Sequence, residues 1–62
     1  MPKVETNRAK IVDRLENDGW RLARHGGEHD IYSRSGAVIV VPRHRELSPG
    51  VARKIAKIAA WG

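Results

Sequence analysis

The stretch GGEHDIYSRSGAVIVVP, residues 26–42, decides the fold of this chain. It opens with Gly26-Gly27 and carries a second cluster at Arg34-Ser35-Gly36, and such clusters are typical of tight hairpin turns. Residues 29–33 lie between the two clusters and indicate a strand, with His29 and Ile31 on one face and Asp30 and Tyr32 on the other. The run at residues 37–41 is apolar and β-branched, which predicts the central or best-covered strand of a sheet. The stretch therefore predicts consecutive antiparallel strands.

A helix is expected before these strands and another after them. Thr6 or Asn7 can cap the first helix, which runs to about Asp18, and Gly19 supplies the left-handed residue that ends it. Ser48 can cap the second helix, and the proline that follows suits a first helical turn. The buried stripe of the second helix is expected to consist of Val51, Ile55, Ile58 and Ala59.

A further strand at residues 20–24 completes the order α-β-β-β-α. The two helices are expected to cover one face of a three-stranded antiparallel sheet. This is an α+β fold of the double-stranded-RNA-binding-domain type. On the second strand, His29 lies on one face while Asp30 and Tyr32 lie on the other. Residues 1–6 have no clear period and are expected to form a frayed arm.

Composition indicates one small basic domain spanning residues 1–62. Lys and Arg number 12 against 7 Asp and Glu, which gives a net charge of +5 and a pI near 10.5. This excess favours a polyanionic partner. The sequence has no Cys, which fits a reducing cytoplasm. Since no apolar run is long enough for a signal peptide or a membrane span, no membrane partner is expected.

His29 is the most informative residue for function. Imidazole titrates near pH 6.5, so a histidine can take or give a proton under cellular conditions. At the start of a strand the backbone is held by the sheet while the ring reaches solvent. A titratable ring among cations suggests acid-base chemistry on a phosphodiester. The alternative is a histidine that bonds a neighbour and does no chemistry. No cofactor is expected, and no metal site, because His25 and His29 straddle a turn.

Other side chains are weaker candidates. His44 follows the third strand and is a second acid or base, a phosphate ligand or a plain loop residue. Tyr32 either stacks on a base or is half buried in the sheet, and Trp61 either docks on the helices or contacts a partner. The candidates for RNA phosphate contacts are Arg24, Arg34, Arg43, Arg45, Arg53, Lys54 and Lys57.

Three pieces of the sequence together resemble a known family. They are Asp18-Gly19-Trp20, Gly27-Glu28-His29-Asp30-Ile31-Tyr32, and Val41-Pro42-Arg43-His44 leading to Glu46-Leu47-Ser48-Pro49-Gly50. In this order and spacing they resemble the HicA toxins, small mRNA interferases of the HicA–HicB toxin–antitoxin systems. The resemblance covers about residues 8 to 60.

The resemblance implies translation-independent mRNA cleavage by one catalytic histidine on the second strand. That role falls on His29, with Gly27 as the glycine of the family's Gly-x-His pattern. It also implies a HicB-type antitoxin that covers the active face. Glu28 and Asp30 depart from the pattern, since a small polar residue often precedes the histidine. The two carboxylates are expected to shape the site, either by holding the imidazole or by repelling RNA.

The expected function is that of a toxin which cleaves mRNA without metal. His29 would remove a 2′-hydroxyl proton so that the oxygen attacks the adjacent phosphorus. The first alternative is a non-catalytic RNA-binding module of the same double-stranded-RNA-binding fold. The second is a protein-interaction module whose charge serves an acidic partner.

Overall fold

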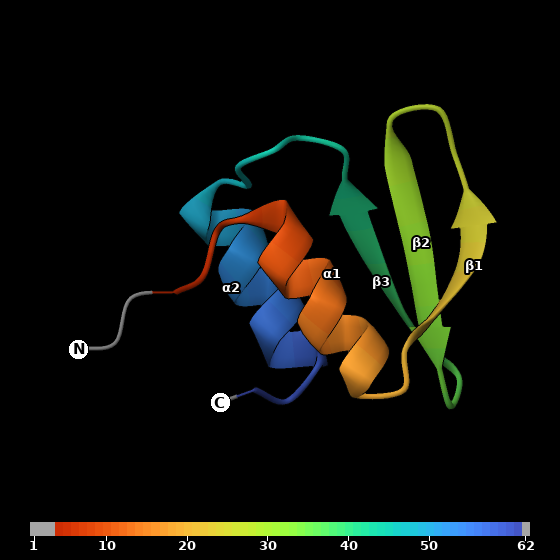
Figure 1. Cartoon of the computed structure of the whole chain (residues 1–62). Coiled ribbons are helices and arrows are strands. Elements are labelled where there is room, and N and C mark those ends of the chain that lie inside the picture. Colours follow the sequence, from red (N-terminus) through yellow and green to blue (C-terminus); the bar gives the residue numbers. More distant parts are fainter. Residues whose placement is uncertain (1–3, 62) are drawn as a thin grey trace.

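The computed structural model describes residues 4–61, and its elements follow the predicted order α-β-β-β-α (Figure 1). The elements are α1 (Arg8–Asn17), β1 (Arg21–His25), β2 (His29–Arg34), β3 (Ala37–Pro42) and α2 (Pro49–Ile58). The caps are those the sequence predicts: Asn7 accepts a hydrogen bond from the amide of Lys10, and Ser48 accepts one from the amide of Val51. The α+β fold class is confirmed.

The three strands form one antiparallel sheet in the order β1-β2-β3. The β2–β3 hairpin closes through Ser35 and Gly36, whose φ angles are +48° and +84°. Positive φ at both central residues is the requirement of a type I′ turn, whose twist matches the flanking strands. β2 is therefore the central strand, and β3 lies at an edge. Residues 37–41 were expected to form the central or best-covered strand, and this expectation is wrong: β3 is an edge strand with only one face covered.

Both helices pack on the same face of the sheet (Figure 1). The core between the two layers consists of Ile11, Leu15, Trp20, Tyr32, Ile39, Val41, Leu47, Ala52, Ile55 and Ala59. Tyr32 is only 4% exposed, so it is more deeply buried than the half-buried sheet tyrosine that was expected, and stacking on a base is excluded. The opposite face of the sheet is not covered by either helix.

The buried stripe of α2 differs from the expected one. Ala52, Ile55 and Ala59 face the core, whereas Ile58 is 40% exposed and Val51 is half buried. The helix is therefore rotated relative to the expected stripe, and two small alanines lie in its buried face. Ile58 and Val51 are left at the side of α2 that adjoins β3.

Strand β1 begins one residue later than expected. The amide of Trp20 donates to the carbonyl of Leu15, 2.9 Å away, so Trp20 belongs to the exit from α1. A β-bulge then interrupts the pairing with β2 between Leu22 and Arg24. The bulge inserts Ala23 as an extra residue and changes which side chains of β1 share a face.

The segment before α1 is not a frayed arm in its described part. The Leu47 amide donates to the carbonyl of Thr6 at 2.8 Å, and the Arg8 amide donates to the carbonyl of Arg45 at 3.0 Å. Asn7 forms a β-bridge with Glu46. Residues 1–3 of the expected arm lie outside the described residues.

The C-terminal end docks on α1, which agrees with the expectation that Trp61 docks on the helices. The Trp61 indole donates to the carboxylate of Asp18, and the guanidinium of Arg14 lies 4.4 Å from the centre of the ring. These contacts tie the end of α2 to α1. Neither helix within residues 4–61 has the length and apolar character needed to cross a membrane.

Candidate active site

His29 is the first residue of β2, and its side chain is exposed on the face of the sheet that the helices leave open. Its neighbour on β3 is Pro42. The backbone around it is held from both sides. The Gly26 amide donates to the His29 carbonyl at 2.9 Å, and the Arg43 amide donates to the Glu28 carbonyl at 3.1 Å. The imidazole is thus presented to solvent on a fixed backbone.

The two hairpin glycines are not equivalent. A Cβ added at Gly26 would lie 2.9 Å from the His29 carbonyl oxygen, closer than real contacts allow. A Cβ at Gly27 would meet nothing within 4 Å, and Gly27 has no positive φ. The steric constraint that fixes the start of β2 therefore falls on Gly26, which was not among the predicted site residues. The expected role of Gly27 gains no steric support.

Asp30 lies on the opposite face of β2 and is buried at the centre of an ion cluster. Its carboxylate accepts from Arg8 Nη2 at 2.6 Å, and from Arg43 Nη2 at 3.0 Å and Nε at 3.1 Å. His25 Nδ1 lies 2.9 Å from the same carboxylate. Arg8 also donates from Nε to the Pro42 carbonyl at 2.9 Å. The cluster joins α1 to the ends of all three strands.

The ionisation of Asp30 follows from these contacts. Burial by itself raises the pKa of a carboxyl group, but here it is outweighed. The hydrogen bonds and charge of Arg43, followed by the charges of His25 and Arg8, hold the pKa of the Asp30 carboxyl below its usual value. Asp30 is therefore a paired carboxylate at neutral pH.

The idea that Asp30 holds the imidazole of His29 is wrong. Successive side chains of a strand point to opposite faces, so Asp30 turns toward α1 while His29 turns away. The carboxylate instead contacts His25, whose side chain is otherwise exposed. Since two arginines neutralise its charge, Asp30 presents little net charge to RNA. Glu28 lies exposed in the β1–β2 turn.

The β-bulge places Arg24 on the same face as His29. Arg24 pairs with Ile31, and His25 pairs with Asp30, whereas regular alternation from Leu22 would have exchanged the two. Paired residues of neighbouring strands share a face. One inserted residue thus brings a cation to the open face and a histidine to the buried carboxylate.

A second group of cations gathers at the same end of the sheet, on its helix side. Asn7, Arg8, Ala9, Arg43 and Arg45 line a shallow hollow at the start of α1. Arg43 directly follows Pro42, the β3 neighbour of His29. The exposed His44 lies in the loop that follows β3, two residues after Pro42.

The remaining predicted cations lie elsewhere. The guanidinium of Arg34 lies beside Gly19 at the far end of β2, roughly 17 Å along the strand from His29 at about 3.3 Å per residue. Arg53, Lys54 and Lys57 are exposed on α2, in the layer opposite to the open face. The predicted cations thus lie in four places: the open face, the hollow at the start of α1, the far end of β2, and α2.

Arg8 was not predicted as a site residue, because the helical pattern places it on the side of the helix expected to face solvent. Its side chain is only 24% exposed. The available signal was Asp30, a charged residue on the strand face that also carries Tyr32. A carboxylate on a core face needs a cationic partner, and Arg8 is the first residue of the helix that covers that face.

Within residues 4–61 no three His, Cys, Asp or Glu side chains are grouped so as to hold a metal ion.

Comparison with known proteins places this geometry in a family. The model of the HicA toxin of bacterial toxin–antitoxin systems matches residues 8–61 of the 62. The chain belongs to the HicA toxin family. No curated protein matches the chain. The HicA assignment gives the chain the role of a toxin in a toxin–antitoxin system and implies a cognate antitoxin partner. The match begins at Arg8, so the HicA region includes the whole ion cluster around Asp30.

Proposed function

We propose that this HicA protein is a cytoplasmic endoribonuclease that cleaves mRNA without a metal ion, with His29 as the catalytic residue. The observation that carries the proposal is the placement of His29. Its imidazole is exposed at the start of the central strand, while hydrogen bonds through Gly26 and Arg43 fix the backbone around it. A general base must be both reachable and positioned, and this arrangement meets both needs.

The reaction is a transfer within the RNA chain. His29 accepts the proton of a ribose 2′-hydroxyl, and the oxygen attacks the adjacent phosphorus. The bond to the 5′ oxygen of the next nucleotide breaks, and that oxygen takes up a proton. The products are a 2′,3′-cyclic phosphate and a free 5′-hydroxyl. His44 is the candidate donor of the second proton because its loop follows the β3 neighbour of His29.

Cations stabilise the charge that develops on phosphorus. Arg24 is the nearest candidate in the sheet, since its partner Ile31 lies two residues from His29 on the same face. Arg45 lies at the hollow at the start of α1. Arg43 is bound to Asp30, so it contributes mainly by fixing the end of β3. The cations of α2 are proposed to bind phosphates farther along the RNA.

A HicB-type antitoxin is the proposed inhibitor. A ribonuclease active on its own cell's mRNA must be restrained, and covering His29 would achieve this. The basic surface favours an inhibitor with acidic residues and fast, salt-sensitive association. This partner is tested separately from the catalytic step.

The test compares the purified chain with His29→Ala on single-stranded RNA in excess EDTA. Wild type should cleave and leave 2′,3′-cyclic phosphate ends, and His29→Ala should be slower by about 10²-fold or more. His44→Ala tests the proposed donor of the second proton and should also be slower than wild type. Circular dichroism should show that both variants keep the fold, because both side chains are exposed.

Equal cleavage by wild type and His29→Ala would refute the catalytic assignment. Cleavage that EDTA abolishes would refute the metal-free mechanism. RNA binding without cleavage by the wild type would instead favour the non-catalytic RNA-binding module.

A further inference from the structure

The outer edge of β3 has unpaired backbone groups. The Arg43 amide donates to the Glu28 carbonyl, and residues paired between β2 and β3 alternate between bonded and non-bonded pairs. Counting back along the register, Ile39 and Val41 bond toward β2, so Val38 and Val40 direct their amides and carbonyls outward. No further strand pairs with this edge among residues 4–61. Such an edge is a template for an additional strand.

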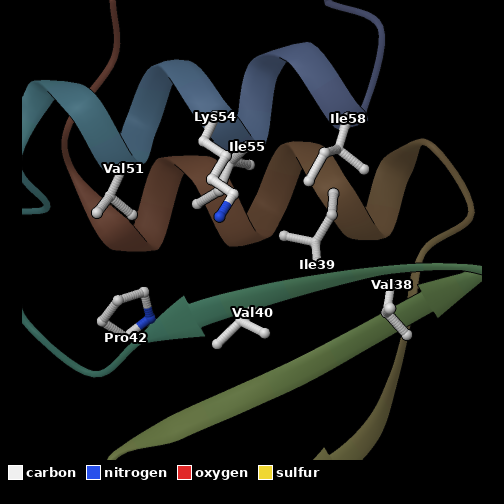
Figure 2. A pocket seen from close by; sticks show the side chains of 8 residues that line it. All are labelled: Val38, Ile39, Val40, Pro42, Val51, Lys54, Ile55 and Ile58. Atoms are coloured by element: carbon white, nitrogen blue, oxygen red, sulfur yellow. The ribbon is translucent and has the colours of Figure 1, made fainter.

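An apolar groove runs along this edge. It encloses about 320 Å³ between β3 and α2, and its walls are mostly aliphatic (Figure 2). Of the four large hydrophobic side chains exposed within residues 4–61, three line it: Val38 (56%), Val40 (49%) and Ile58 (40%). The fourth, Leu22, lies on β1 at the opposite edge of the sheet. Exposed apolar side chains gathered beside an open strand edge indicate a protein-binding surface rather than an RNA-binding one.

The charge of the groove selects its occupant. Lys54 projects from α2 into the groove beside Ile55 (Figure 2), and Arg53 and Lys57 are exposed on the same helix. A second copy of this chain, pairing β3 with β3, would bring two Lys54 side chains and two chains of charge +5 together. Like charges directly opposed are destabilising. The groove is therefore complementary to an extended segment that carries apolar side chains and a carboxylate.

We propose that the β3–α2 groove binds an extended, apolar and acidic segment of the cognate antitoxin, which pairs with β3 as a fourth strand. This inference deepens the proposed function, on which its account of inhibition rests. Main-chain bonds to Val38 and Val40 supply affinity, and the aliphatic walls with Lys54 supply selectivity.

The position of the groove explains how an occupant would inhibit His29. Pro42 lies at one end of the groove and is the β3 neighbour of His29. Neighbouring strands are about 4.8 Å apart, so a strand added to β3 lies roughly 10 Å from β2. Side chains of the added strand opposite Pro42 then reach the open face beside His29. The antitoxin segment is thus bound by β3 and α2, and it covers His29 at the end of the sheet.

The experiment uses the full chain and the product of the neighbouring reading frame as the probe. The anchoring variant is the double change Val38→Gln with Ile58→Gln, and the matched control is Leu22→Gln, which alters an equally exposed side chain on the other edge strand. The double variant should weaken antitoxin binding by about tenfold or more, because buried apolar anchors dominate interfaces. The control should bind as wild type does. RNA cleavage by the double variant, measured without antitoxin, should be unchanged.

Hydrogen exchange gives a second measurement that needs no variant. The amides of Val38 and Val40 face outward in the free chain, so they should exchange fast there and slowly in the complex. Unchanged exchange at both amides, or equal binding by the double variant and wild type, overturns the proposal. So does failure of the neighbouring product to bind the folded chain. If wild type does not cleave RNA, the proposed ribonuclease activity is refuted but the proposed groove is not, because binding and cleavage are measured separately.

Discussion

Two adjacent residues of β2 have opposite environments. The His29 side chain is exposed on the open face of the sheet, and the Asp30 carboxylate is buried among Arg8, Arg43 and His25. The histidine is available for chemistry, while the aspartate fixes the structure around it. Arg43 connects the two roles, because its side chain holds Asp30 and its amide holds the carbonyl of Glu28.

Asp30→Asn should destabilise the fold at neutral pH and change its response to acid. Because the pKa of Asp30 in the folded state is below its ordinary value of 3.8, its stabilising effect is complete above about pH 4. The effect is lost as pH falls through the lower, folded-state pKa. The melting temperature of the variant should be lower than that of wild type at pH 7, and the difference should shrink below pH 4.

Thermal unfolding by circular dichroism from pH 7 to pH 2.5 measures this difference. Asp13→Asn is the matched control, since Asp13 is exposed on α1. A difference between wild type and Asp30→Asn that stays constant down to pH 2.5 would contradict the ionic role of Asp30.

The sequence could place His29 but not the partners of Asp30. Alternation along the strand assigns the two residues to opposite faces, and the covered face follows from Tyr32. Which cation reaches a buried carboxylate depends on how α1 crosses the sheet, and no local pattern encodes that crossing. Arg8 therefore looked like a solvated helix residue.

The β1–β2 hairpin is the element that positions the site. Its bulge turns Arg24 toward the face of His29, and its turn brings Gly26 against the His29 carbonyl. Caps, turns and strand periods made the elements predictable. The bulge was not, because Arg21-Leu22-Ala23 carries no glycine or other turn residue to mark it. The rotation of α2 was also missed, since Val51 and Ile58 fit the helical period as well as Ala52 does.

Alanine substitutions should separate the two hairpin glycines. Gly26→Ala forces the new methyl group against the backbone of His29, 2.9 Å away, so unfolding free energy should fall by about 1–3 kcal/mol. Cleavage should fall with it, since the histidine backbone must shift. Gly27→Ala meets open space and should change stability by less than about 0.5 kcal/mol.

Urea unfolding of the two variants measures the difference in stability. Cleavage is measured at urea concentrations well below the unfolding midpoint, where both variants are folded. Equal stability of the two variants would show that the hairpin adjusts at Gly26 without strain. A loss of cleavage in a fully stable Gly27→Ala would show that Gly27 acts on the RNA rather than on the fold.

At the scale of the whole molecule, the positive charge is divided between two layers. Arg24 shares the open face with His29, whereas Arg53, Lys54 and Lys57 lie on α2 behind the sheet. The net charge of +5 was evident from the sequence, but its division was not, because it depends on how the layers pack. An RNA that contacts both groups must pass from the open face of the sheet to the helix side.

Changing Lys54 and Lys57 together to Ala should test whether RNA does so. Each phosphate contact on a single strand contributes about 0.7 to the slope of log affinity against log salt, so losing two should flatten the slope by about 1.4. Binding should weaken alike for all RNA sequences. Fluorescence anisotropy across a salt series measures the slope, and Lys10→Ala, which removes an exposed cation outside the predicted phosphate contacts, is the control. An unchanged slope would mean that α2 faces away from RNA and serves the antitoxin alone.

The antitoxin should also stabilise the toxin as a whole. A chain of 62 residues without disulfides has a small core, so binding to the folded state has a large effect on its melting temperature. At free antitoxin 100-fold above the dissociation constant, the gain is about 2.7 kcal/mol, or roughly 10–20 °C for a domain of this size. Differential scanning calorimetry of the toxin alone, the antitoxin alone and the complex measures the shift.

Diethyl pyrocarbonate modification, read by mass spectrometry, shows whether His29 is covered in the same complex. A partner that raises the melting temperature but leaves His29 reactive and cleavage intact would bind the fold without masking the site, and inhibition would then require a different contact from the one that stabilises.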